Sequence, residues 1–179
     1  MAQEQTGRTS DASSAQGNSR AILRDPQPGD LGWIVSRHGE LYAKEYGWTM
    51  AFEALVAGIM AAFGEHHDPE RERLWIAEID GEKVGSIMLV RDPDTPGTAK
   101  LRVLLVEPAA RGKGIGTLLV ETCVQFARDA GYARIVLWTE DVLTTARAIY
   151  RRAGFKCVAS EPNNAFGADS TSETWELVF

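Results

Sequence analysis

The segment from Leu104 to Val120 constrains the fold more than any other part of the chain. It reads LLVEPAARGKGIGTLLV, in which an apolar strand ends at Val106, a turn follows, and a glycine-rich run opens a helix. Backbone N–H groups at a helix start lack intrahelical partners, and the helix dipole adds partial positive charge there. Such a start binds phosphate readily, and Arg111 and Lys113 add two cations. The segment therefore predicts an α/β domain in which a strand leads into an anion-binding helix.

Two familiar phosphate motifs fail on spacing. A dinucleotide fingerprint, G-x-G-x-x-G, would need a third glycine where Thr117 stands, and a P-loop would need a glycine where Glu107 stands. What remains is R-G-x-G-x-G after a strand that ends in Val-x-Pro. This pattern resembles the acetyl-CoA loop of the GNAT superfamily of N-acetyltransferases. A glycine-rich turn that binds no ligand is the alternative.

A second segment, LWTEDVLTTARAIYRRAGF, resembles the other cofactor segment of that superfamily, a strand followed by a helix that ends in A-x-x-x-Y-x-x-x-G-F. The matching residues are Ala146, Tyr150, Gly154 and Phe155. One departure is plain, because Leu143 stands where the family often has asparagine. A contact with the pantetheine arm is therefore either lost or made by Thr139 or Thr144.

The resemblance extends in element order from Trp33 to Phe179, although its specific motifs lie between Val103 and Phe155. The run YAKEYGW, Tyr42 to Trp48, resembles acetyltransferase domains that some bacteria fuse behind a winged-helix regulator, and we expect the domain to stand alone here. The resemblance implies a mixed α/β fold, mostly antiparallel. Helices cover both faces of the central sheet, and a pair of splayed central strands holds acetyl-CoA.

Hydrophobic periodicity and turn signals predict the elements. The expected strands are 31–38, 74–79, 83–90, 98–106, 134–138, 155–161 and 174–179, and the expected helices are 39–47, 49–63, 114–130 and 143–153. Thr49 is the expected N-cap of its helix, and Asp80-Gly81 is a hairpin signal. The polar loop 162–172 is expected to close over the acceptor with Phe166 as an apolar contact, or else to be an ordinary mobile loop.

Composition bounds the rest. Residues 1–20 are polar and are expected to form a disordered tail, with the N-acetyltransferase domain at 21–179. The net charge of −6 argues against nucleic-acid binding; it weakly favours a cationic partner, or only keeps the protein soluble. Cys123 and Cys157 are expected to pack as small hydrophobes, and no Cys/His spacing predicts a metal. With no membrane-length apolar run and no signal peptide, we expect a cytoplasmic protein with no membrane partner.

The resemblance also implies residue roles. Leu104, Leu105 and Val106 would pair with pantetheine, and the Val106 N–H would point at the thioester oxygen. Tyr150 would be the general acid that protonates the CoA thiolate. The other implied cofactor contacts are Arg111, Gly112, Lys113, Gly114, Ile115, Gly116, Thr117, Thr139, Ala146, Tyr150 and Arg152, with an exposed helix face as the alternative for Arg152. The implied substrate residues are Glu45, Tyr46, Trp48 and Trp138.

Together these observations predict direct transfer of an acetyl group from acetyl-CoA to a primary amine, on a small molecule or a protein. The alternatives are a non-catalytic acyl-CoA-binding sensor and a purely structural α/β domain. The general base stays open among a water chain and several side chains, namely Glu45, Tyr46, Glu107, Glu140 and Asp141. A monomer and a homodimer are both compatible with the sequence.

Overall fold

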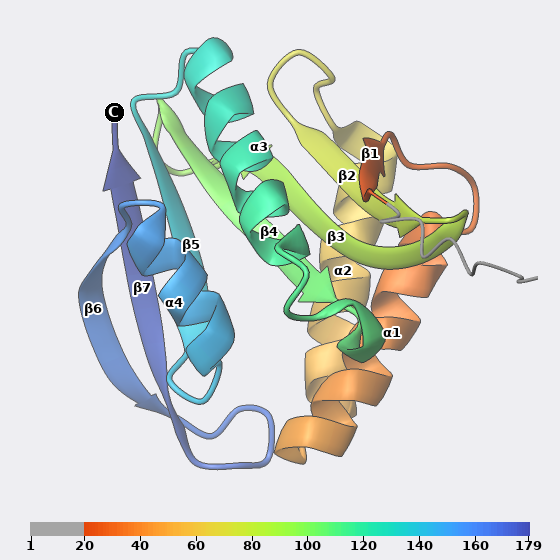
Figure 1. Cartoon of the computed structure of the whole chain (residues 1–179). Helices are drawn as coiled ribbons and strands as arrows, with labels where there is room; N and C mark the ends of the chain where they lie inside the picture. The colour runs from red at the N-terminus through yellow and green to blue at the C-terminus, as the bar shows by residue number, and fades with distance from the viewer. Residues whose placement is uncertain (1–19) are drawn as a thin grey trace, which may run out of the picture.

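A computed structural model describes residues 20–179, which form a seven-stranded sheet in the order β1-β2-β3-β4-β5-β7-β6 (Figure 1). The strands are β1 (Ile22–Arg24), β2 (Arg73–Ile79), β3 (Glu82–Arg91), β4 (Thr98–Val106), β5 (Arg134–Glu140), β6 (Lys156–Asn163) and β7 (Ser170–Val178). The helices of this part are α1 (Asp30–Tyr46), α2 (Met50–His66), α3 (Ile115–Asp129) and α4 (Thr144–Arg152), with a 3₁₀ turn η1 (Pro108–Ala110). The predicted tail lies, apart from Arg20, outside the described residues.

Helices cover both faces of the sheet, α3 and α4 on one and α1 and α2 on the other (Figure 1). The split follows from alternation along the strands, since successive side chains point to opposite faces. On β3, Leu89 packs into the cluster beneath α3, whereas its neighbour Met88 packs into the cluster beneath α2. The predicted fold class is confirmed: β4 and β5 pair parallel, and the other strand pairs within residues 20–179 are antiparallel.

The first helix corrects the sequence analysis, which predicted a strand at 31–38 and a short helix at 39–47. The structure has one continuous helix, α1, whose buried residues Ile34, His38 and Leu41 recur at helical spacing. Gly39, the first residue of the predicted short helix, lies inside α1. A Cβ at this position would lie 2.9 Å from the carboxyl carbon of Glu53, so the end of the Glu53 side chain lies directly against the glycine. Sequence alone does not reveal that tertiary reason for a mid-helix glycine.

The other elements match the prediction more closely. The Thr49 side chain accepts a hydrogen bond from the Ala51 N–H and caps α2 as expected, and β2 and β3 pair around Asp80-Gly81. The predicted loop 162–172 is shorter, because β6 continues to Asn163 and β7 begins at Ser170. The short strand β1, which pairs with β2, was not predicted.

The turn between β6 and β7 docks onto the start of α2. The Phe166 side chain is buried, and its ring lies 5.1 Å from that of Trp48 and 5.8 Å from that of Trp138. The Thr49 N–H donates to the Phe166 carbonyl at 3.0 Å. Phe166 thus makes its apolar contact with aromatic side chains of the protein, and closure of this loop over an acceptor stays a prediction.

The two cysteines differ. Cys123 is buried on α3, as predicted, whereas Cys157 is exposed, which corrects the expectation that both would be packed. Cys157 lies on β6, the edge strand of the sheet, and no helix covers that strand. Between residues 20 and 179, no helix has the length and apolar character that crossing a bilayer requires.

The central strands β4 and β5 separate partway along their length. Their parallel pairing covers Thr98 to Leu101 on β4 and ends at Leu101 opposite Leu137. Beyond that point β4 stays paired with β3, and β5 stays paired with β7. The splay predicted for these strands is thereby confirmed, and it leaves a gap in the middle of the sheet.

Candidate active site

Two cavities meet at the gap between β4 and β5. The first lies between the last turns of α1, the end of β4 and α4, and its lining includes Tyr46, Val106, Arg111, Gly116 and Ile149. The second lies toward α1 and α2, and its lining includes Trp48, Phe52, Arg102, Trp138 and Tyr150. Residues that line both cavities are Tyr42, Leu104, Leu143 and Ala146. Two ligands, one in each cavity, would therefore meet beside Leu104.

A bulge in β4 turns its end toward this junction. Met88 of β3 pairs with Arg102, and Ser86 pairs with Leu105. Between these two pairs, β4 has two residues where β3 has one, and the extra residue of β4 forms the bulge. Val103 adopts a φ of 47°, and the Ser86 hydroxyl donates to the Val103 carbonyl at 2.9 Å. A side chain with a hydroxyl at position 86 thus holds the bulge in place.

The bulge sets the direction of the Val106 amide. The Glu107 N–H donates to the Val84 carbonyl at 2.8 Å, which makes those two residues a hydrogen-bonded pair. In an antiparallel ladder the next pair, here Gly85 and Val106, is a non-hydrogen-bonded pair. The Val106 N–H therefore points away from β3, into the gap.

The glycine-rich run forms an open helix start. Gly112 and Gly114 have φ of 77° and 78°, and Gly114 is the N-cap of α3 with no side-chain capping bond. Within the described part of the chain, the loop N–H groups of 112–114 have no backbone acceptor, and those of 115–117 belong to the first helical turn. A third cavity beside this start is lined by Lys113, Gly114 and Ile115. These donors suit an anionic ligand.

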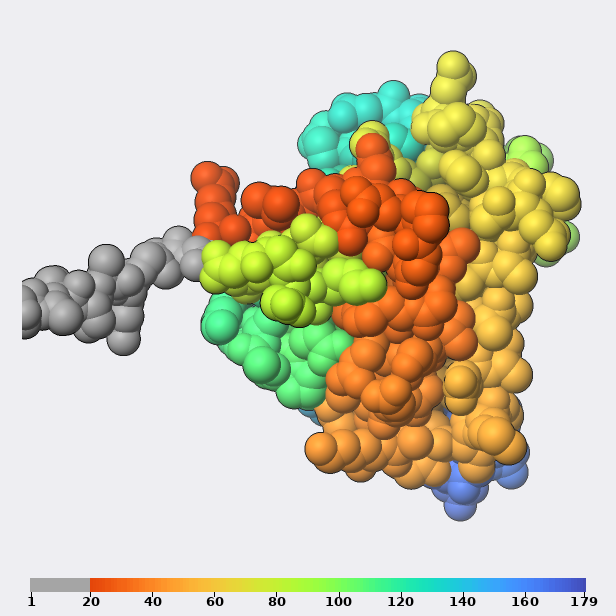
Figure 2. Space-filling model, turned by 90° about the vertical axis from the view of Figure 1, so that its right-hand side faces the viewer, coloured from red at the N-terminus to blue at the C-terminus, as the bar shows by residue number. Residues whose placement is uncertain are grey.

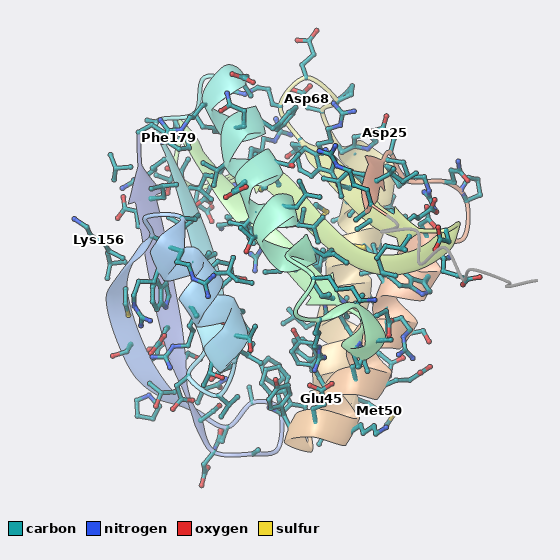
Figure 3. The ribbon with its side chains drawn as sticks, viewed as in Figure 1. Asp25, Glu45, Met50, Asp68, Lys156 and Phe179 are labelled. Carbon is teal, nitrogen blue, oxygen red and sulfur yellow. The ribbon has the colours of Figure 1, made fainter. Side chains whose placement is uncertain are left out.

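Ion pairs join α1 to the segment that follows β4. Arg111 makes two bonds to the Glu45 carboxylate, at 2.8 and 3.0 Å, and its Nε donates to the Val106 carbonyl. Arg37 makes two bonds to Glu107, at 2.6 and 2.9 Å. Figure 2 shows α1 packed beside this segment, and Figure 3 shows Glu45 near the end of α1. The Arg111 side chain is thus engaged with Glu45, so the loop's backbone amides, with Lys113, are its free donors.

Tyr150 lies on α4 with its ring against Phe155, at 5.9 Å between centroids, and only 5% of the residue is exposed. It lines the second cavity. Burial raises the pKa of its phenol above the ordinary value of 10. The hydroxyl therefore stays protonated, as a hydrogen-bond donor must.

Among the polar and ionisable residues of the second cavity, sequence reasoning missed His38, Tyr42 and Arg102. Burial lowers the pKa of His38 to about 4, and its Nδ1 lies 2.8 Å from the Ile34 carbonyl oxygen. The neutral imidazole donates through Nδ1, which leaves Nε2 as the acceptor. Tyr42 stacks on His38 with 5.6 Å between ring centroids. The helical spacing of these two residues was the available signal, and it was hidden by the predicted strand.

The structure brings most of the predicted site residues together. The first cavity is lined by Leu104, Leu105, Val106, Arg111, Gly116, Ala146, Glu45 and Tyr46, and the second by Leu104, Ala146, Trp48, Trp138, Thr139 and Tyr150. The predicted residues that line none of the three cavities are Gly112, Thr117 and Arg152. Thr139 lines the second cavity whereas Thr144 does not. Among the carboxylates that the sequence leaves as candidates for the general base, Glu45 and Glu107 form ion pairs with arginines.

Glu140, another of those carboxylates, is fully buried at the end of β5. Its Oε1 accepts from Asn163 and Ser172, while its Oε2 has no partner among the described residues. No grouping of three or more His, Cys, Asp or Glu side chains suited to a metal ion occurs within residues 20–179.

Comparison with known proteins gives consistent matches. A family model described as "Acetyltransferase (GNAT) family" matches residues 32–155. Mycothiol acetyltransferase of Beutenbergia cavernae is 30% identical over 170 residues, which cover 86% of this chain and 54% of that protein. Human N-acetyltransferase 8B is 39% identical over 85 residues, which cover 46% of this chain and 37% of that protein. The chain thus spans only about a third to a half of the length of these relatives.

Solved structures share the fold at low sequence identity. A GCN5-related N-acetyltransferase from Kribbella flavida has a TM-score of 0.72 and 20% identity, over 89% of this chain and 98% of that one. A Salmonella typhimurium protein solved with its cofactor acetyl-CoA has a TM-score of 0.70 and 17% identity, over 88% and 93%.

Proposed function

The chain belongs to the GNAT family of acetyltransferases, and from that premise we propose that it transfers an acetyl group from acetyl-CoA directly to a primary amine. The observation that carries the proposal is the junction of two cavities beside Leu104, where the paired part of β4 and β5 has ended. A transferase needs two ligands to meet at one point. A binding module needs only the first cavity.

The first cavity suits the pantetheine arm of CoA, and the start of α3 beside the third cavity suits its diphosphate. The N–H groups of the loop 112–114 and of the first turn of α3 would bind the diphosphate, with Lys113 adding charge. Leu104, Leu105 and Val106 would line the pantetheine arm along the unpaired edge of β4. Leu143 replaces the family's frequent asparagine and lines both cavities, so the arm would meet an apolar wall there.

Acetyl-CoA would supply the acetyl group and a thiolate leaving group. The amine nitrogen attacks the thioester carbon, a C–N bond forms and the C–S bond breaks. The Val106 N–H stabilises the developing oxyanion, an effect worth a few kcal/mol for one well-placed donor. The ammonium first loses one proton to water. The departing thiolate then takes a hydrogen bond and a proton from Tyr150, and the phenol regains its proton from the attacking nitrogen, so that the products are the amide and the free thiol. Because the pKa of the Tyr150 phenol is raised, the phenol keeps its proton until negative charge develops on the leaving sulfur.

The test is release of free thiol from acetyl-CoA against a broad panel of amines, with cofactor affinity measured by calorimetry. We expect Tyr150→Phe to lower kcat by about 100-fold while the dissociation constant for acetyl-CoA stays near the wild-type value. Tyr132→Phe is the matched control, because the Tyr132 hydroxyl donates to the Arg71 carbonyl away from both cavities. That control should keep wild-type turnover.

Different failures have different meanings. Wild-type turnover in Tyr150→Phe would remove this tyrosine from the mechanism and leave the transferase intact. Binding of acetyl-CoA without thiol release for any amine would favour an acyl-CoA sensor. No binding of any CoA species would overturn the proposal as a whole.

A further inference from the structure

Arg102 is the one charged side chain among the described residues that line the second cavity. It directly follows Leu101, whose pairing with Leu137 is the last between β4 and β5. Leu101 packs beneath α3, so alternation directs Arg102 to the opposite face, the one that α1 and α2 cover. The guanidinium therefore lies where the strands begin to separate, on the side away from the diphosphate site.

No carboxylate within residues 20–179 forms an ion pair with Arg102. Asp92, the acidic residue that influences it electrostatically, lies 2.9 Å from the Lys100 ammonium. Burial lowers the pKa of Arg102, with Asp92 acting in the opposite direction, and arginine nevertheless stays charged. A partly desolvated guanidinium without a fixed anion is costly, and an anionic ligand would relieve that cost through charge-assisted hydrogen bonds.

The rest of the second cavity is apolar and aromatic. Its walls include Trp48, Phe52, Val56, Ile59 and Trp138, and no acidic residue lines it. Ligands with several positive charges, such as polyamines and aminoglycosides, would meet one cation and no anion there. Such walls instead favour an apolar body, because burying apolar surface stabilises a complex.

Resting on the proposed function, we propose that the acceptor is an amine that also carries a carboxylate and an apolar body, and that Arg102 binds the carboxylate. Arg102 and Val106 lie on the same strand, and four residues of strand span about 13 Å at most. With its carboxylate at Arg102, the acceptor extends along β4 and its amine reaches the junction beside Leu104, which lies between these two residues. Apolar α-amino acids and ω-amino acids are the classes that fit this description.

The experiment compares matched acceptors that differ only in the carboxylate. The pairs are phenylalanine with 2-phenylethylamine and 6-aminohexanoate with pentylamine, each assayed by thiol release under saturating acetyl-CoA. We expect kcat/KM to favour the carboxylated member of at least one pair by about 10- to 100-fold, the range for a hydrogen-bonded charge. In Arg102→Gln the preference should fall toward one through a higher KM, and Arg102→Lys should restore part of it.

Arg128→Gln is the matched control, since it removes an exposed arginine of α3 that lines none of the three cavities. It should keep the preference. Calorimetry with acetyl-CoA on each variant checks that folding and the cofactor site are intact. Acetylation of amines with no carboxylate preference, or a preference unchanged in Arg102→Gln, would overturn this inference and leave the proposed function standing. Acetylation of neither member of either pair would overturn the inference, and the broad amine panel then decides separately whether the transferase assignment falls too.

Discussion

At the scale of single residues, the second cavity contains a histidine that is held neutral. His38 is only 2% exposed, and burial lowers its pKa to about 4 from an ordinary 6.5. An imidazole in this state accepts hydrogen bonds through Nε2 over the whole physiological range. It adds no positive charge beside Arg102, so the charge of the cavity rests on one guanidinium.

This histidine makes stability depend on pH. The unfolded chain binds a proton at His38 below about pH 6.5, whereas the folded protein does so only below about pH 4. The stability that the folded protein has from burying neutral His38 is therefore fully present above pH 6.5 and is lost as the pH falls toward 4. We expect a loss of about 2 kcal/mol between pH 7 and pH 5, measured by urea unfolding. His38→Gln should flatten this fall, and an equally steep curve in that variant would contradict the assignment.

Sequence reasoning did well where a residue's role depends on its own neighbours in the chain. The glycines of the loop before α3 and Thr49 as a helix cap follow from local backbone chemistry. It failed for Arg102 and His38, because their surroundings come from strands and helices distant in sequence. The net charge of −6 weakly suggested a cationic partner, yet the second cavity carries a positive charge. Net charge describes the average surface and not the wall of one cavity.

At the scale of elements, β3 and β4 approach each other very closely opposite the bulge. A Cβ at Gly85 would lie 2.8 Å from the Leu105 carbonyl oxygen and 3.2 Å from the Leu119 side chain. Backbone atoms cannot move aside as a flexible side chain can. Glycine at this position is therefore a condition for the β4 geometry that aims the Val106 N–H into the gap.

We expect Gly85→Ala to lower the free energy of unfolding by about 1–3 kcal/mol, as overpacking of a close contact does. It should also weaken binding of acetyl-CoA, because β4 must shift at the site. Gly58→Ala is the matched control: Gly58 lies on α2 and an added Cβ meets nothing within 4 Å. That change should stabilise the protein by about 0.5–1 kcal/mol. Equal stability of both variants in urea titrations would show that the β3–β4 contact is looser than described.

Element prediction succeeded for strands and helices with uninterrupted periodicity. It failed for α1, where Gly39 lies inside a helix because of its contact with Glu53. It also missed β1, three residues long, which is a strand only because β2 offers it an edge. In both cases the deciding interaction is tertiary, and no window of local sequence contains it.

At the scale of the whole molecule, one sheet supports two hydrophobic clusters. Neighbouring residues on β2 divide between them, with Trp75 in the cluster beneath α3 and Ile76 in the cluster beneath α2. Unfolding of either cluster would expose to water the apolar side chains on one face of the strands that both clusters share. The two clusters are therefore expected to unfold together.

We predict a single cooperative transition in denaturant. Far-UV circular dichroism, tryptophan fluorescence and thiol labelling of buried Cys123 should share one midpoint. Exposed Cys157 should label at once in native conditions and serves as the internal reference. A labelling midpoint for Cys123 well above the fluorescence midpoint would mean that the two clusters unfold independently.

The early end of the β4–β5 pairing has a further consequence for the protein's solubility. It creates two edges inside the sheet, each with backbone groups that no neighbouring strand satisfies. Edges at the rim of a sheet recruit other chains and promote aggregation. Here the edges face one another across a narrow gap, and helices flank it on both sides. We expect such a gap to admit a slender, unbranched molecule with its own amides more readily than a second polypeptide strand with bulky side chains.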